Sequence, residues 1–290
     1  MNRSILKLGS TLNKKQHHSP VKTVGSQSAR LLASLYDRAQ TTFTLAEARS
    51  ITGLSAGSTR SLLHKATQRG LVARLKSGLF TLVPLELGSE TEYSGNPYLA
   101  ARALVGNRPY YLSHATAMEL HRMVIQPRLG IFISTSKRMM DRVMHSTEYK
   151  FIYIQPEQIF GTVPHWITKQ EQVVLSDVER TVIDGLRRPE YCGGITEVAR
   201  GLWMRHVDMK VGKLIQYATR LKVGAVIRRL GYLLEIYQLA SPAHLDQVRN
   251  ELTRTYDLLD PLQPAGGRYV NRWRLQLNVP ADELDSVRRT

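Results

Sequence analysis

The sequence predicts an α+β fold with two domains, and three observations support this prediction. The chain has 290 residues, which exceeds one small module and suits two domains of ordinary size. Hydrophobic residues make up 42% and charged residues 22%, which is ordinary globular usage and excludes a wholly disordered chain. Runs with helical spacing of apolar residues alternate with short β-branched or aromatic runs, so helices and strands are both expected.

The charge of the chain is strongly positive and unevenly distributed. Its 40 Lys and Arg against 24 Asp and Glu give a formal net charge of +16. The first 90 residues hold 13 of the basic residues and only four of the acidic ones. An excess of this size indicates a polyanionic partner, and nucleic acid is the leading candidate.

Composition also excludes several classes of protein and site. No run approaches the roughly 18–20 apolar residues of a membrane span. A single cysteine, Cys192, cannot form an intrachain disulfide or supply a Cys-rich zinc site. The polar, basic start of the chain lacks the apolar core of a signal peptide. We therefore expect a cytoplasmic protein with no cofactor, no metal and no membrane partner.

The beginning of the chain is predicted to be a basic flexible arm over residues 1–26. Residues 1–22 contain five basic residues and no acid, separated by small and polar residues. Lys14 and Lys15 are the candidates for phosphate contacts in this arm, because they adjoin the module that follows. A solubilising tail is the alternative interpretation.

Three short helices are expected next. Leucines at helical spacing predict the first, and capping residues predict the start of the other two. The signals are the leucines of residues 28–36, the capping-box pair Thr44 and Glu47 with Gly53 ending that helix, and Ser55 before a helix that runs to about Gln68.

A hairpin is predicted directly after these helices. Two strand-like runs, Leu71–Leu75 and Leu79–Pro84, are joined by Lys76, Ser77 and Gly78. The second and third helices are separated by the short glycine-containing turn of residues 52–54. Three helices in this order followed by a basic hairpin are typical of a winged helix-turn-helix, which we assign to residues 27–90.

The third helix is predicted to present a small, polar and basic face without an acid. On a helical wheel, its apolar residues fall on one side and its polar residues on the other. Such a face suits the major groove, and the hairpin suits the neighbouring backbone. A winged helix used for protein contacts is the alternative. The candidate DNA-binding residues are Ser58, Arg60, Ser61, His64, Lys65, Gln68, Arg74 and Lys76.

The second domain, residues 91–240, is predicted to be mixed α/β with a helical C-terminal part. Helices are expected over 96–105, 113–121 and from Asp177 to about 186, strands over 110–112, 129–134, 150–154 and 173–175, and helices over 196–239 with breaks near 207–208 and 223–224. A C-terminal extension, 241–290, includes the alternating run 268–277. This run could complete the sheet of the second domain, with Trp273 as an anchor.

The charged residues and histidines of the second domain that could act in catalysis or metal binding are predicted to have structural roles instead. Arg180, Asp184 and Arg188 have i,i+4 spacing, which predicts a ladder of ion pairs rather than catalytic acids. His114 and His121 are seven residues apart, whereas helical zinc ligands sit three or four apart, so a hydrogen-bonded His114 at a helix start is expected. No glycine-rich phosphate loop or kinase motif set is present. We predict no catalytic residues and no enzyme.

Four segments of the second domain resemble one known family. They are residues 110–117 (YYLSHATA), 174–186 (VLSDVERTVIDGL), 187–194 (RRPEYCGG) and 225–235 (AVIRRLGYLLE). In their order and spacing, and together with an N-terminal winged helix, they resemble the AbiE-type abortive-infection antitoxins (AbiEi). The resemblance covers about residues 27–240, and it does not extend to the arm or to the tail after 240.

The resemblance implies an antitoxin of a type IV toxin–antitoxin system in phage defence. Such a protein is expected to neutralise a nucleotidyltransferase-like toxin, often without a stable complex. It is also expected to repress its own operon by binding inverted repeats in the promoter. The family's DNA contacts then correspond to Ser58, Arg60, Ser61, Lys65, Arg74 and Lys76.

Two further basic clusters lie in the second domain. Each is either solvated surface or an electropositive face for DNA, for the toxin or for the tRNA that such a toxin modifies. Two other functions stay open: a plain winged-helix regulator with a small-molecule sensor domain, and an enzyme that modifies the toxin. The residues assigned to antitoxicity or a second basic face are Lys137, Arg138 and Arg142 in one cluster, and Arg228 and Arg229 in the other.

Overall fold

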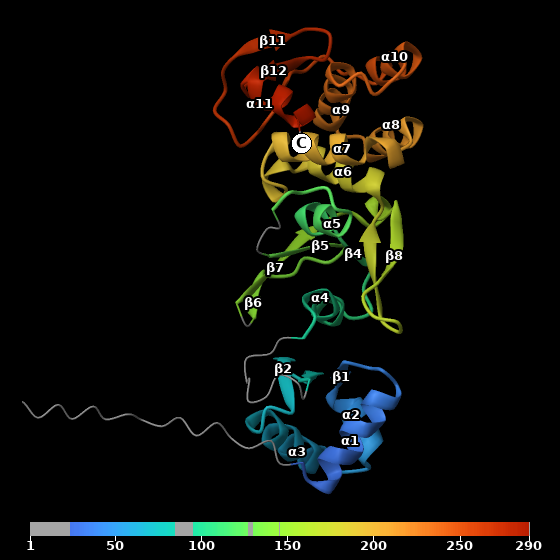
Figure 1. The fold of residues 1–290 in the computed structure, drawn as a ribbon, viewed down its shortest axis with the longest axis vertical. Coiled ribbons are helices and arrows are strands. Elements are labelled where there is room, and N and C mark those ends of the chain that lie inside the picture. Colours follow the sequence, from blue (N-terminus) through green and yellow to red (C-terminus); the bar gives the residue numbers. More distant parts are fainter. Residues whose placement is uncertain (1–23, 85–94, 127–129, 145, 290) are drawn as a thin grey trace, which may run out of the picture.

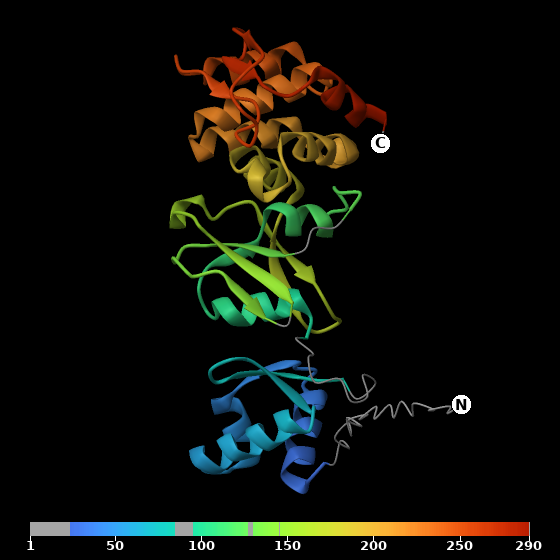
Figure 2. The same ribbon diagram turned by 90° about the vertical axis from the view of Figure 1, so that its left-hand side faces the viewer.

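A computed structural model describes residues 24–84, 95–126, 130–144 and 146–289. Eleven α-helices and three sheets occur in these ranges, so the predicted α+β class is confirmed. The molecule is elongated, with three tiers stacked along its long axis (Figures 1 and 2). We call them the N-terminal unit (24–84), the sheet unit (95–176) and the helical unit (177–289). None of the described helices is long and apolar enough to cross a membrane.

The N-terminal unit contains three helices and a three-stranded antiparallel sheet of order β1-β3-β2. The capping predictions are confirmed: Thr44 and Glu47 form a capping box, and the Ser55 hydroxyl accepts from the Ser58 amide. Gly53 ends α2 with a φ of 71°, which glycine adopts without strain. Its elements are α1 (Ser26–Asp37), β1 (Thr42–Thr44), α2 (Leu45–Thr52), α3 (Ala56–Gln68), β2 (Val72–Lys76) and β3 (Leu79–Leu82).

The sheet unit is built on a six-stranded mixed sheet of order β6-β7-β5-β4-β9-β8. Helix α4 packs on one face of this sheet, against Ile131 and Ile133. Helix α5 packs on the other face, beside Phe132. Burial on both faces explains why three successive residues of β5, Ile131, Phe132 and Ile133, are all apolar. The elements are α4 (Pro97–Val105), β4 (Tyr110–Leu112), α5 (His114–Leu120), β5 (Ile131–Thr135), β6 (Arg142–Met144), β7 (Thr147–Tyr153), β8 (Thr162–Trp166) and β9 (Gln172–Ser176).

The helical unit begins at Asp177, whose side chain caps α6 as predicted. The predicted breaks near 207–208 and 223–224 are confirmed, since α7 and α8 are separated there and α9 begins at Gly224. The helices are α6 (Val178–Arg187), α7 (Ile195–Arg205), α8 (Val211–Leu221), α9 (Gly224–Ile236), α10 (Pro242–Asn250) and α11 (Ala281–Ser286).

The tail forms a small sheet of its own, so the expectation that it completes the sheet of the second domain is wrong. The run 268–277 is split by a turn into β11 (Arg268–Val270) and β12 (Leu275–Leu277), which pair with β10 (Asp257–Leu258). The predicted anchor is present: Trp273 is fully buried and its Nε1 donates to Glu235 at 2.6 Å. A Cβ on Gly231 would lie 2.1 Å from this ring, so only glycine fits there.

Candidate nucleic-acid interface

The outward face of α3 is polar, basic and accessible. Thr59, Leu63 and Ala66 are buried against the rest of the N-terminal unit. The opposite side chains are exposed, and they carry no acid. These exposed residues are Ser58, Arg60, Ser61, His64, Lys65 and Gln68, so the structure places six predicted site residues on one surface.

A hollow of about 450 Å³ separates α3 from the β2–β3 hairpin. Arg60 and His64 line it from the helix, and Arg74 lines it from the hairpin. Arg74 is exposed, and its Nε lies 3.4 Å from the Lys76 carbonyl oxygen. Arg60 of α3 and Arg74 of the hairpin therefore line one hollow.

Lys76 does not belong to this exposed surface, which corrects its assignment as a wing contact with DNA. Its Nζ donates to the carbonyl oxygens of Ala103 and Leu104, at 3.3 and 3.0 Å. These carbonyls end α4, where a helix attracts cations. Burial lowers the pKa of Lys76, and the nearby charges of Arg142 and Arg108 act in the same direction.

The hairpin is shared between the N-terminal unit and the sheet unit. Leu75 and Leu79 belong to the hydrophobic core that contains α4 and the sheet. The buried carboxylate of Glu171 accepts from Thr41 at 2.6 Å and from Arg102 at 2.7 Å, one residue from each unit. Sequence reasoning missed these contacts, because no local pattern relates residues 69 and 130 positions apart.

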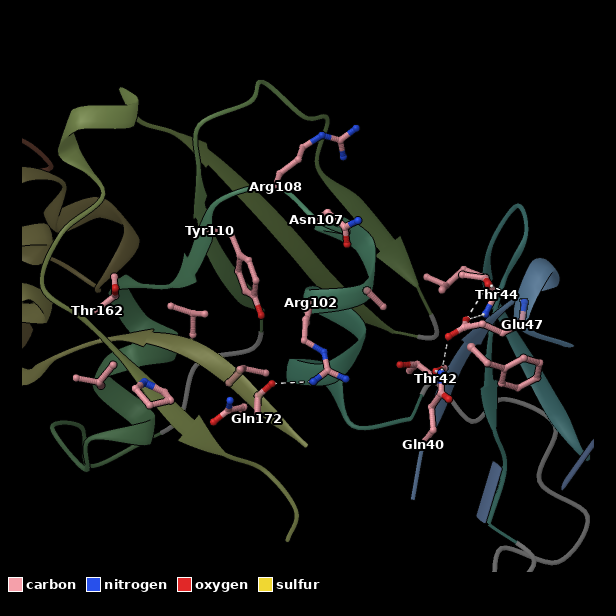
Figure 3. A pocket seen from close by; sticks show the side chains of 18 residues that line it. Gln40, Thr42, Thr44, Glu47, Arg102, Asn107, Arg108, Tyr110, Thr162 and Gln172 are labelled. Atoms are coloured by element: carbon pink, nitrogen blue, oxygen red, sulfur yellow. Dashed lines mark hydrogen bonds between the residues drawn. The ribbon is translucent and has the colours of Figure 1, made fainter. Parts of the chain in front are cut away.

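A second hollow, of about 820 Å³, lies between the N-terminal unit and the sheet unit. Figure 3 shows side chains entering it from both sides, among them Gln40 and Glu47 from one unit and Arg102 and Tyr110 from the other. We call it the junction cleft. None of its residues was predicted as a site, since they come from segments far apart in the sequence.

The two predicted basic clusters of the second domain have different environments. Lys137, Arg138 and Arg142 are exposed, and Arg138 lies over the Tyr153 ring at 4.7 Å. Arg228 and Arg229 are 1% and 4% exposed, so their assignment to a surface face is wrong.

The burial of Arg228 and Arg229 has a clear physical cause. The Arg228 guanidinium donates to Asp257 and to oxygens of Thr253 and Thr255. Arg229 donates to the Leu186 carbonyl at 2.6 Å and twice to the Leu258 carbonyl. Both side chains thus satisfy backbone carbonyls of the tail that α9 covers, and a partner at the surface cannot reach their guanidinium groups.

Three of the four segments that carry the family resemblance meet at a buried polar cluster, and the fourth, residues 225–235, bonds to the Leu186 carbonyl through Arg229. Tyr111 donates to Asp184 at 3.0 Å, and Arg180 donates to both residues. The predicted Arg180–Asp184 ion pair is present and buried. The predicted Asp184–Arg188 pair is wrong, since Arg188 pairs with Glu190 and Asp184 uses its second oxygen for Tyr111.

His114 lies beside this cluster at the start of α5. Its Nδ1 lies 2.9 Å from the Ser113 hydroxyl, as expected for a hydrogen-bonded histidine, and its ring packs edge-on against Tyr191. Ser113 makes no side-chain capping bond, because its hydroxyl is shared with His114 and Ser134. Burial lowers the pKa of His114 to about 4.

The remaining predictions concern a metal site and the basic arm. No group of three or more His, Cys, Asp or Glu side chains that could hold a metal ion is found across residues 24–84, 95–126, 130–144 and 146–289. His121 is used elsewhere, with its Nε2 2.6 Å from the Ser176 carbonyl oxygen. Lys14 and Lys15 lie outside the described residues.

Comparisons with known proteins give a likeness of fold. No family model matches the chain, and no curated protein matches it. The structure is similar to the crystal structure of the RV2827C protein from Mycobacterium tuberculosis, with a TM-score of 0.69 and 15% sequence identity. The match covers 92% of this chain and 96% of that chain, so the two proteins share a fold over nearly their whole length.

Proposed function

We propose that the protein binds double-stranded DNA through a winged helix formed by the N-terminal unit. The observation that carries the proposal is the exposed face of α3, on which six polar or basic side chains and no acid point away from the core. In this proposal α3 enters the major groove, and Arg74 on the hairpin contacts the neighbouring backbone. Lys76 is left out, because it is bound to α4.

The test is the affinity for duplex DNA from upstream of the protein's own gene, measured by fluorescence anisotropy over a salt series. The variant replaces Arg60, Lys65 and Arg74 by Ala. We expect weaker binding and a salt slope reduced by about 2–3, since each lost phosphate contact contributes about 0.9.

The matched control replaces three exposed cations that lie outside the N-terminal unit, Lys169, Lys210 and Arg254, by Ala. It has the same net charge as the test variant, so it separates a local contact from general attraction to a polyanion. Equal affinity of the two variants would contradict DNA binding through α3.

We further propose that the protein is a type IV antitoxin that represses its own operon at inverted repeats. The support for this part is the resemblance of four segments to the AbiE-type antitoxins. Its partner would be a nucleotidyltransferase-like toxin encoded next to it, and two copies of the protein would occupy one inverted repeat. Lys137, Arg138 and Arg142 are the exposed cations proposed for neutralisation.

Growth of cells that express the neighbouring gene tests this second part. The full-length protein should restore growth, and replacing Lys137, Arg138 and Arg142 by Gln should impair the rescue while sparing DNA binding. Full rescue by that variant would remove the assignment of these residues. A harmless neighbouring gene would favour the plain regulator, and a covalent mass change on the toxin would favour the enzyme.

A further inference from the structure

The junction cleft has the size and the placement of a ligand-binding site. Its volume of about 820 Å³ falls within the ~300–1,000 Å³ typical of small-molecule sites. Its walls come from both units, with β1 and the start of α2 on one side and α4, β4, β8 and β9 on the other (Figure 3). A molecule bound there contacts both units at once.

Two arginines line the cleft, Arg102 and Arg108. Arg102 has a side chain that is 32% exposed and donates one N–H to the Glu171 carboxylate and one to the Gln172 carbonyl, so three of its five N–H groups remain. Arg108 donates one N–H to the Val105 carbonyl. Glu47, the carboxylate among the lining residues, already accepts bonds from Gln40 and Thr44. The cleft therefore favours a ligand that is negatively charged and rich in acceptors.

Tyr110 adds a donor that the fold leaves unsatisfied. Its side chain lines the cleft, the residue is only 8% exposed, and its hydroxyl makes no hydrogen bond of good geometry within the described residues. Burial raises the pKa of this hydroxyl, and the Val174 backbone and Arg102 act in the opposite direction. A buried unpaired donor is costly in a folded protein, and an acceptor group of a ligand in the cleft would remove this cost.

Part of the wall formed by the sheet unit is apolar. Val163 and Pro164 come from β8, and Val174 comes from β9. These side chains suit a short carbon frame rather than a free inorganic ion. We infer that the junction cleft binds a small anionic molecule, a phosphate ester or a carboxylate on a short carbon frame, with Arg102, Arg108 and Tyr110 as its polar contacts.

Isothermal titration calorimetry of the full-length protein tests the inference with three probes. Ribose 5-phosphate represents phosphate esters, citrate represents carboxylates, and ribose is the uncharged control. We expect one equivalent of one of the two anions to bind and ribose not to bind. The titrations contain no DNA, so their result is independent of the proposed DNA binding.

Two charge-neutral variants separate the cleft from general attraction of anions to a basic protein. Tyr110→Phe removes the hydroxyl in the cleft, and affinity for the bound anion should fall about tenfold. Tyr149→Phe is the matched control, because its hydroxyl is also buried without a hydrogen-bond partner but does not line the cleft. Both variants should fold, since neither loses a hydrogen bond of good geometry.

Three results would overturn the inference. They are the absence of saturable binding for both anions, binding of ribose as tight as that of the anions, and an equal effect of Tyr110→Phe and Tyr149→Phe on the anion's affinity. A loss in Tyr110→Phe alone, with Tyr149→Phe behaving as the unmodified protein, supports the cleft. The probe that binds identifies which of the two anion classes the site takes.

Discussion

Arginines in two helices of this protein have opposite environments. Arg60 on α3 is exposed beside other polar side chains, whereas Arg228 and Arg229 on α9 are buried. All of them count equally toward the net charge of +16. The difference teaches that net charge predicts a class of partner, while only burial shows which cations can meet that partner.

The neighbours of each arginine in the sequence explain the difference. Arg60 is flanked by threonine and serine in a helix whose opposite face supplies the apolar contacts. Arg228 and Arg229 lie between Ile227 and Leu230 in a helix that is buried on most of its sides. Guanidinium groups in such a helix have to bond to protein acceptors, and here the tail supplies them.

The largest effect is expected from Arg228→Met. Removing the guanidinium leaves Asp257 and the Thr255 carbonyl without this donor, whereas the Thr253 carbonyl keeps a bond from Arg274. The methionine keeps most of the apolar volume. Because the Asp257 side chain is 36% exposed and can be hydrated, we expect a loss of about 2–3 kcal/mol in the free energy of unfolding, measured with urea.

Arg60→Met is the matched substitution on α3. It should change the free energy of unfolding by less than about 0.5 kcal/mol, as usual for an exposed site. Similar losses in the two variants would contradict the distinction between the two helices.

Lowering the pH is expected to have an intermediate effect on the free energy of unfolding, through His114 beside the buried polar cluster. Burial lowers its pKa from 6.5 to about 4, while the charge of Asp184 opposes this shift and that of Arg180 adds to it. The unfolded chain therefore binds a proton between these values that the folded chain does not, so stability falls as the pH drops from 6.5 toward 4. At pH 5 the loss relative to pH 7 is about 2 kcal/mol from this group.

His114→Asn tests this assignment. Asparagine tolerates the φ of 51° at this position better than most residues, and it does not titrate in this range. Urea unfolding at pH 7 and pH 5 should show a smaller difference for the variant than for the unmodified protein. Equal differences would mean that other groups, such as His121, whose pKa burial also lowers, cause the pH dependence.

Local signals in the sequence predicted much of the fold. Three local signals set the boundaries of α2 and α3, and all are present. The Thr44–Glu47 capping box begins α2, Gly53 ends it, and Ser55 begins α3. Short edge strands such as β6 and β8 were not predicted, since three to five half-exposed residues carry little periodicity.

Long-range contacts could not be predicted from the sequence. Lys76 has its partners 27 and 28 residues away, and Thr41 has its partner 130 residues away. The junction cleft depends on these contacts, because they set the two units against each other. The exposed face of α3 depends only on helical geometry, so a helical wheel identified its six residues. The assignment of Lys76 on the hairpin failed because tertiary packing against α4 intervened.

The smallest effects are expected from two substitutions on one strand, because Arg74 and Lys76 lie two residues apart on β2. Lys76→Met removes two hydrogen bonds to the end of α4 and should lower the free energy of unfolding by about 1–2 kcal/mol. Under the proposed function it should leave the salt slope of DNA binding unchanged. Arg74→Met should change the free energy of unfolding by less than about 0.5 kcal/mol, and it should reduce the salt slope of DNA binding by about 0.9. Because the two variants carry the same charge change within one strand, a drop in salt slope for Lys76→Met would show that Lys76 leaves α4 to contact DNA.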